Sequence, residues 1–270
     1  MTTDIRRPIS EELLARYRNL GFTYPIPVLS HVEARRFRTK VEETRCELGG
    51  RVTRFDGAHH FFRWAWDLAA HPRLLDCLEQ FLGPNILLKS TRVFYKPGNS
   101  SAFVGWHQDG YTEQEQGAHV PTIWLGLTAA TLENGCLRVV PGSHRLGLVP
   151  HPELPDPNNL TSAGTTAQAQ IDAPHALVMN AGEMSIHHPL MLHASDPNTT
   201  AEPRIGFSAS YATPALKSSL TEVAWMRGVG VGQAANLKMV EQPPEASLEK
   251  AAAAYRARFG HRIHYAAPID

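Results

Sequence analysis

From Pro84 onward, the sequence becomes a series of short apolar runs separated by turn residues rich in Gly, Pro and Asn. The expected strands cover residues 86–95, 104–109, 122–128, 136–140, 175–179, 183–187 and 205–211. Many short strands at this spacing are typical of a β-sandwich or barrel. This part of the chain is therefore predicted to be a β core, and an all-helical fold is excluded.

Helical signals precede and follow the β-rich stretch. The expected helices cover residues 10–20, 30–48, 62–81 and 247–259. Ser10 and Ser30 stand at N-cap positions with acidic residues soon after them, and Gly83 is a helix stop signal. Pro72 is expected to divide the third helix, since proline lacks the amide donor. Residues 21–29 are interrupted by prolines and are expected to be irregular.

The 270 residues are predicted to form a single domain (1–270), because no linker-like stretch divides them. Residues 1–83 would form a mainly helical part that packs on the barrel. Residues 84–215 would form the β core, and residues 216–270 a C-terminal extension with a helix. Hydrophobic residues make up 43% of the chain, which is enough for a sizeable core and excludes wholesale disorder.

Charge and cysteine content exclude several classes of partner. Lys+Arg and Asp+Glu are both 26, and a neutral balance argues against nucleic acid, whose phosphates need a basic surface. No apolar run reaches the roughly 18 residues of a membrane span. Residues 1–20 lack the apolar middle of a signal peptide, so a cytoplasmic location is expected. Cys46, Cys77 and Cys136 form no CxxC pair and predict neither disulfides nor a thiolate zinc site.

Histidine is unusually frequent, with 14 residues, and one His-x-Asp pattern stands out. On a strand, His107 and Asp109 would point to the same face, because side chains alternate with a period of two. An imidazole and a carboxylate together suit a divalent metal. A second histidine would complete the two-His-one-carboxylate facial triad, which leaves coordination positions open for substrates and oxygen.

His193 is the best candidate for the second histidine. Asp196-Pro-Asn marks a turn, and in an antiparallel hairpin centred there His193 and Arg204 would oppose each other and share a face with Ser195. A metal ligand, a hydroxyl and a guanidinium would then line one surface, and a guanidinium can bind a carboxylate with two hydrogen bonds. An ordinary surface arginine beside a turn explains Arg204 equally well.

Four motifs in order resemble the phytanoyl-CoA dioxygenase family. They are Trp106-His-Gln-Asp109, Asn134-Gly-Cys-Leu-Arg-Val-Val-Pro-Gly-Ser-His144, Gly182-Glu-Met-Ser-Ile-His-His188, and His193-x-Ser-x-Pro-Asn198 with Arg204. Tyr24-Pro-Ile-Pro-Val-Leu-Ser30 is similar to the bacterial small-molecule branch. The resemblance implies a mainly β fold with flanking helices around a double-stranded β-helix core, which is a jelly roll like that of the cupins.

The resemblance also implies the cofactors, which are Fe(II), 2-oxoglutarate as co-substrate and O2, with ascorbate as a possible support of activity. The matched residues form two groups: the iron ligands His107, Asp109 and His193, and the 2-oxoglutarate-binding residues Arg204, Ser195 and Trp124. No catalytic residue is expected beyond the metal ligands. Halogenating relatives replace the metal carboxylate with a small residue. Because Asp109 is retained, hydroxylation is favoured over halogenation.

Substrate contacts are less constrained by the sequence. Relatives usually carry an aromatic residue three positions after the metal aspartate, where this chain has Thr112, preceded by Tyr111. Both are candidate substrate residues. His60 could belong to the substrate lip. Arg92, which shares a strand face with Lys96, could meet an anionic substrate or a carboxylate of 2-oxoglutarate, although a solvated face is an equal alternative. For His187 and His188, a supporting or packing role is expected rather than metal ligation.

The expected reaction is hydroxylation of an unactivated C–H bond in a small polar metabolite or natural-product intermediate, with succinate and CO2 as co-products. Desaturation, cyclisation or epimerisation with the same cofactors is the first alternative. A zinc-dependent hydrolase on the same three ligands and a non-catalytic cupin-like binding protein are alternatives of other classes. The expected partner is the small-molecule substrate, without nucleic acid, membrane or an obligate protein partner.

Overall fold

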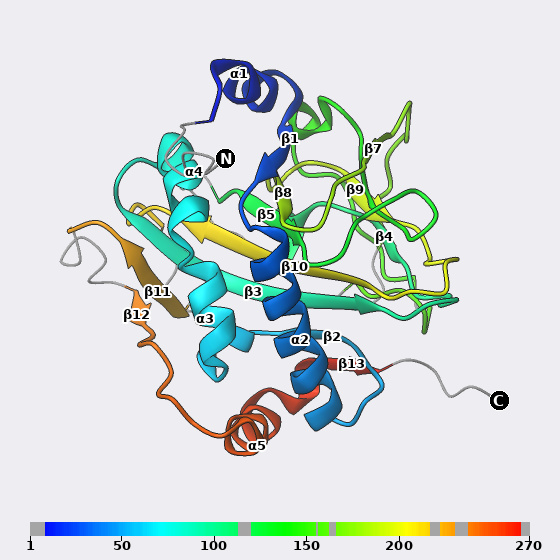
Figure 1. Cartoon of the computed structure of the whole chain (residues 1–270). Helices are drawn as coiled ribbons and strands as arrows, with labels where there is room; N and C mark the ends of the chain where they lie inside the picture. The colour runs from blue at the N-terminus through cyan, green and yellow to red at the C-terminus, as the bar shows by residue number, and fades with distance from the viewer. Residues whose placement is uncertain are drawn as a thin grey trace.

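The computed structural model describes residues 9–112, 120–154, 156–161, 166–216, 222–229 and 237–265 (Figure 1). Its first helices, α1 (Glu11–Leu20) and α2 (His31–Glu47), begin where serine caps were expected. The Ser10 side chain accepts from the Leu13 amide. Ser30 and Glu33 form a reciprocal capping box, which satisfies amides that the first helical turn leaves unpaired. Local capping therefore fixes both N-termini.

Three further helices complete the α part. The expected third helix is divided into α3 (Arg63–Ala69) and α4 (Pro72–Leu82), with Pro72 in the first turn of the second piece. Helix α4 ends at Gly83, whose φ of 76° lies in the region that favours glycine. Helix α5 (Leu248–Phe259) follows the cap residue Ser247. The predicted helices and the break at proline are thus confirmed.

A nine-stranded sheet forms the centre of the molecule. Its strands, in spatial order, are β1 (Phe22–Pro27), β8 (Glu183–His187), β5 (Thr122–Gly126), β10 (Arg204–Ala212), β3 (Ile86–Lys96), β11 (Glu222–Arg227) and β12 (Lys238–Met239). Strand β2 (Val52–Asp56) pairs with the far end of β3, and β13 (Ile263–Tyr265) pairs with β2. All of these pairings are antiparallel except that of β11 with β12.

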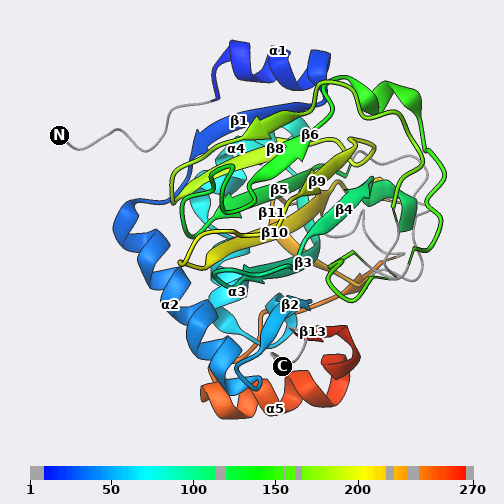
Figure 2. The same ribbon diagram turned by 90° about the vertical axis from the view of Figure 1, so that its right-hand side faces the viewer.

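A smaller sheet of four antiparallel strands packs against the large one (Figure 2). Its order is β4 (Val104–His107), β9 (His193–Ser195), β6 (Leu137–Val139) and β7 (His175–Leu177). Single 3-10 turns lie at η1 (Ala58–His60), η2 (Asp109–Thr112), η3 (Ser143–Leu146) and η6 (Gly260–Arg262). Turn η2 directly follows β4, and this short connection sets the position of Asp109.

The two faces of the large sheet have different environments. One face carries residues such as Ile123, Phe207 and Tyr211, which pack with side chains of the helices in the main hydrophobic core. Alternate residues on the other face point toward the small sheet, where Trp124 packs against Leu137. Strand alternation thus gives one face to the core and the other to the space between the sheets. The expected mainly β fold with flanking helices is confirmed.

Two expectations about local structure were wrong. Residues 21–29 contain strand β1, which lies at the edge of the sheet as described, with β8 as its neighbour, and edge strands tolerate prolines. The hairpin between His193 and Arg204 does not form, because β9 pairs within the small sheet and β10 within the large sheet. The turn at Asp196 therefore carries the chain from one sheet to the other. Within the described ranges, no helix is both long and apolar enough to cross a membrane.

Candidate functional site

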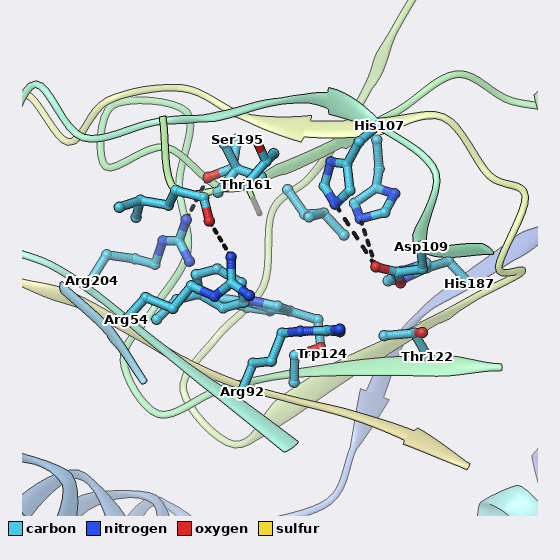
Figure 3. Close-up of a pocket in the computed structure, with 16 residues that line it drawn as sticks. Arg54, Arg92, His107, Asp109, Thr122, Trp124, Thr161, His187, Ser195 and Arg204 are labelled. Carbon is cyan, nitrogen blue, oxygen red and sulfur yellow. Dashed lines mark hydrogen bonds and ion pairs between the residues drawn. The ribbon is translucent and has the colours of Figure 1, made fainter. Parts of the chain in front are cut away.

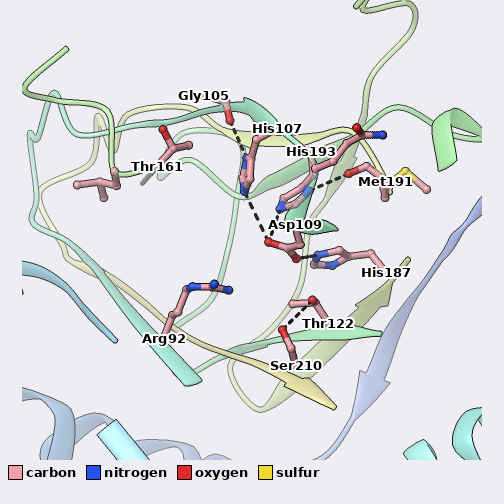
Figure 4. A network of polar contacts seen from close by, with 12 residues as sticks. Arg92, Gly105, His107, Asp109, Thr122, Thr161, His187, Met191, His193 and Ser210 are labelled. Atoms are coloured by element: carbon pink, nitrogen blue, oxygen red, sulfur yellow. Dashed lines mark hydrogen bonds and ion pairs between the residues drawn. The ribbon is translucent and has the colours of Figure 1, made fainter. Parts of the chain in front are cut away.

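Two histidines and one aspartate converge at the edge of the small sheet (Figure 4). His107 on β4 and His193 on β9 are direct partners in the antiparallel register, and their ring centroids are 4.0 Å apart. Asp109 had been expected on the strand, but it lies in turn η2. Its Oδ1 is nevertheless 3.8 Å from His107 Nε2 and 3.9 Å from His193 Nε2. Strand register and a tight turn thus bring the three side chains together.

The backbone orients both imidazoles toward this centre. His107 Nδ1 lies 2.8 Å from the Gly105 carbonyl, and His193 Nδ1 lies 3.0 Å from the Met191 carbonyl. These carbonyls require a proton on Nδ1, so the Nε2 lone pairs face the aspartate. Burial lowers the pKa of His107 to about 4 and holds the pKa of His193 well below its usual value. Both rings are therefore neutral near pH 7, as metal ligation requires.

A third histidine secures the aspartate from the opposite side. His187, at the end of β8, places Nε2 3.1 Å from Asp109 Oδ2 and is 2% exposed. Burial by itself would raise the pKa of Asp109, but His193, His187 and Arg92 together hold it well below its usual range. The carboxylate is thus an anion with one oxygen toward His107 and His193 and the other toward His187. His187 reaches Asp109 from the large sheet and has the supporting role expected for it.

The donor set fits iron(II). One nitrogen from each of His107 and His193 and one oxygen of Asp109 lie within 4.8 Å of one another. Two imidazoles and one carboxylate with open positions are the arrangement of non-haem Fe(II) oxygenases. The Nδ1 contacts with backbone carbonyls supply the outer interactions that hold metal-binding histidines in place. These three residues could therefore hold the metal.

A buried guanidinium occupies the other end of the site (Figure 3). Arg204, at the start of β10, is 2% exposed, and its Cζ lies 5.0 Å from the centre of the Trp124 ring. Its Nη2 donates to the Gly135 carbonyl at 2.7 Å and to Ser195 Oγ at 2.6 Å. Its Nε is buried without a hydrogen-bond partner. In the part of the chain that the structure describes, no carboxylate pairs with this cation.

A second buried cation adjoins the first. Lys96, the partner of Arg204 in the β3–β10 register, donates to Ser195 Oγ and to the carbonyls of Ser195 and Asp196. Burial lowers the pKa of Arg204 to about 10. Burial and the nearby Arg204 charge hold the pKa of Lys96 well below its ordinary value. Burying a charge is costly without an ion partner. This end of the site therefore favours a bound anion.

One cavity connects the two ends. Its lining combines the three metal-site residues with polar and apolar side chains from both sheets, namely Arg54, Arg92, Phe94, Val104, His107, Asp109, Thr122, Trp124, Leu137, Leu160, Thr161, His187, His193, Ser195, Arg204 and Ser208. The expected metal and 2-oxoglutarate residues and Arg92 all belong to this set.

Of the other expected substrate residues, His60 lies outside the lining of this cavity and packs against Phe259, with ring centroids 5.1 Å apart. Tyr111 and Thr112 belong to η2, but their side chains lie outside the described part of the chain. Arg54 was missed because strand β2 was missed. The short run Val52-Thr-Arg-Phe-Asp56, with polar residues two apart, was the available signal.

Comparison with known proteins identifies the family. The model of the family described as phytanoyl-CoA dioxygenase (PhyH) matches residues 10–206, which is more than half of the chain. The chain belongs to the phytanoyl-CoA dioxygenase family. The matched region contains the metal centre, Trp124, Ser195 and Arg204, so the family match covers both ends of the cavity.

The relatives of this chain differ in how much of their own length the chain matches. Human peroxisomal phytanoyl-CoA dioxygenase is 31% identical over 148 residues, which are 53% of this chain and 44% of the human protein. L-proline trans-4-hydroxylase of Streptomyces griseoviridis is 28% identical over 222 residues, covering 69% and 81% of the two chains. The solved apo structure of a non-haem monooxygenase, ThoJ, has a TM-score of 0.75 at 28% identity, with 93% and 95% of the chains covered.

These similarities confirm the jelly-roll core and the enzyme class expected from the motifs. The relatives of this chain are named as a dioxygenase, a hydroxylase and a monooxygenase, and a solved structure that shares the fold is a complex with Fe(II) and 2-oxoglutarate. The His107, Asp109 and His193 cluster agrees with this class in donor type and spacing.

Proposed function

We propose that this protein is an Fe(II)- and 2-oxoglutarate-dependent dioxygenase that hydroxylates an unactivated C–H bond of a small polar metabolite or natural-product intermediate. One observation carries the proposal. A single cavity has an open metal triad at one end and, at the other, the buried Arg204, which has no carboxylate partner among the described residues. A dicarboxylic keto acid that spans metal and guanidinium satisfies both ends.

The residues of the Arg204 end would hold the distal carboxylate. The unpartnered Nε of Arg204 can donate to a carboxylate, and Ser195 Oγ lies 2.6 Å from that guanidinium. Trp124 packs below Arg204 and restricts its orientation. Iron bound at the triad with 2-oxoglutarate and O2 supplies the oxidising chemistry, and succinate and CO2 are the co-products. The protein contributes orientation and a dry cavity.

The lining of the cavity supports a small polar substrate. Beside the metal triad and Arg204 it carries the hydroxyls of Thr122, Thr161 and Ser208. The hydroxylase relative whose length is mostly covered is named for L-proline, which is a small polar molecule. Both considerations favour a small polar substrate over a fatty acyl-CoA.

Other reactions and other classes of protein account for the residues of the site less completely. Desaturation, cyclisation or epimerisation would require the same triad and the same Arg204 end. A zinc hydrolase would use the triad with a bound water, but it gives no role to a buried cation at the far end. A non-catalytic binding protein gives no role to the oriented Nε2 atoms of His107 and His193. Asp109 at the metal-ligand position favours hydroxylation, desaturation or cyclisation over halogenation, and hydroxylation is the outcome that we propose.

Succinate production tests the proposal directly. Wild-type protein, Fe(II), ascorbate and 2-oxoglutarate should give slow succinate formation without substrate, and Arg204→Ala should abolish it. An anaerobic Fe(II) complex should show a visible charge-transfer band when 2-oxoglutarate binds, and the variant should lose it. His60→Gln, outside the cavity, is the matched control. If wild type gives neither succinate nor the band, the oxygenase proposal is wrong and zinc-dependent hydrolysis is tested next.

A further inference from the structure

A buried lysine lies beside the Arg204 end of the site but outside the described lining of the cavity. Lys96 ends strand β3, is 0% exposed and is the register partner of Arg204 on β10. Among the described residues it forms no ion pair, and the nearby Asp196 carboxylate binds Arg138 at 2.8 Å instead. The proposed function gives this lysine no role of its own.

The ammonium group of Lys96 is matched by three acceptors. An ammonium has three protons to donate, and Nζ donates to the Ser195 carbonyl at 2.9 Å, to Ser195 Oγ and to the Asp196 carbonyl. These acceptors lie where the chain leaves β9 in the small sheet and crosses to β10 in the large sheet. Because Lys96 belongs to the large sheet, it ties this crossing to the strand beside Arg204.

The hydroxyl of Ser195 is saturated by contacts within the protein (Figure 3). A hydroxyl has one proton and two lone pairs. The proton of Ser195 is donated to the Gly135 carbonyl at 2.9 Å, and its oxygen accepts from Lys96 and, at 2.6 Å, from Arg204 Nη2. No proton remains for a ligand, so Ser195 links Lys96 to Arg204.

This link holds one side of the Arg204 guanidinium. Nη2 donates to Ser195 Oγ and to the Gly135 carbonyl, and these two contacts use both of its protons. The buried Nε has no partner and is left for a ligand. Without Lys96, Ser195 Oγ would lose the contact that fixes its rotamer, and the guanidinium would be held less firmly. The nearby lysine charge also favours an anion at this end of the site.

We propose that Lys96 is a positioning residue for 2-oxoglutarate, which holds Arg204 through Ser195 and adds a second positive charge near the distal carboxylate. This inference rests on the proposed function. It requires Lys96 to strengthen the binding of keto acids that have a distal carboxylate and not of those that lack one. 2-Oxoglutarate and 2-oxopentanoate provide the comparison, because they share the keto-acid end and a five-carbon chain.

The test measures the affinity of the Fe(II)-loaded protein for each keto acid, anaerobically, from the visible charge-transfer band. Lys96→Met removes the charge and the donors at similar length, Lys96→Gln keeps donors without charge, and Ser195→Ala removes the link to Arg204. Lys89→Met is the matched control, because Lys89 is a buried lysine of the same strand outside the described lining of the cavity. Thermal midpoints without ligand report any general loss of stability.

We expect Lys96→Met to weaken 2-oxoglutarate binding roughly 10- to 100-fold, the loss typical of a hydrogen-bond partner that carries charge, and to leave 2-oxopentanoate binding unchanged. Lys96→Gln should recover part of the loss. The double variant Lys96→Met/Ser195→Ala should lose less than the product of the two single losses, because residues in one network are coupled. Lys89→Met should bind both keto acids as wild type does.

The inference is overturned if Lys96→Met keeps wild-type affinity for 2-oxoglutarate, if it weakens both keto acids equally, or if Lys89→Met shows the same loss. Single losses that multiply in the double variant would refute the link through Ser195. Should Lys96→Met not fold, Lys96→Gln is judged by the same criteria. A wild-type protein without the band would instead refute the proposed function.

Discussion

Replacement of His187 by phenylalanine tests how the aspartate ligand is held. The ring of similar size keeps the packing against His193, whose centroid is 4.6 Å away, but it removes the 3.1 Å contact between Nε2 and Asp109 Oδ2. The lost interaction is a charge-assisted hydrogen bond between buried groups, worth about 1.5–3 kcal/mol. Loss of such outer contacts costs roughly 10- to 100-fold in metal affinity.

Cobalt(II) is a suitable probe, because its visible absorption reports both affinity and coordination geometry. Titration of metal-free protein should show His187→Phe binding cobalt 10- to 100-fold more weakly, with an altered spectrum because Oδ2 can rotate toward the metal. His187→Gln, which retains an N–H donor, should recover part of the affinity. His60→Gln should match wild type. Unchanged cobalt affinity in a folded His187→Phe protein would refute the role assigned to His187.

Two further predictions concern the Arg204 end of the site and the stability of the protein in acid. A Cβ on residue 206 would lie 2.2 Å from Trp124 Cζ2, so Gly206→Ala should displace the indole below Arg204. The KM for 2-oxoglutarate, measured by succinate formation, should then rise about 10- to 100-fold, and an unchanged KM would count against Trp124 as a positioning group. His59 is buried, with its pKa well below 6.5. It is therefore neutral in the folded state, while the unfolded chain takes up a proton below pH 6.5. The contribution of His59 to the free energy of unfolding should be constant above that pH and should fall below it by up to about 1.4 kcal/mol per pH unit. Urea titrations at pH 7 and pH 5 should therefore show a smaller loss of stability for His59→Gln than for wild type.

Elements with local signals could be predicted from the sequence. Strand β8 has the expected bounds, Glu183–His187, and the helix starts at Ser10 and Ser30 follow from capping chemistry. These features depend on residues within a few positions of one another. The resemblance to the phytanoyl-CoA dioxygenase family supported the choice of metal residues, and the family match covers all three of them.

Features that depend on distant partners could not be predicted in this way. Strand β1 forms because it pairs with β8, and the residues between 21 and 29 carry no local signal for that pairing. Ser195 and Arg204 do meet, at 2.6 Å, but by a crossing between sheets and not by the expected hairpin register. The approach of Arg54 to the cavity likewise depends on the pairing of β2 with β3.

Because the site is divided between two sheets, the packing of the sheets sets the distance between its two ends. His107 and His193 belong to the small sheet, and Arg204 belongs to the large one. Under the proposed function, the span that 2-oxoglutarate would bridge is therefore set by sheet packing, at about 10 Å between faces. A keto diacid one carbon shorter or longer than 2-oxoglutarate would fail to reach both ends. Loops around the opening can consequently diverge to admit new substrates while the requirement for a five-carbon keto diacid stays constant.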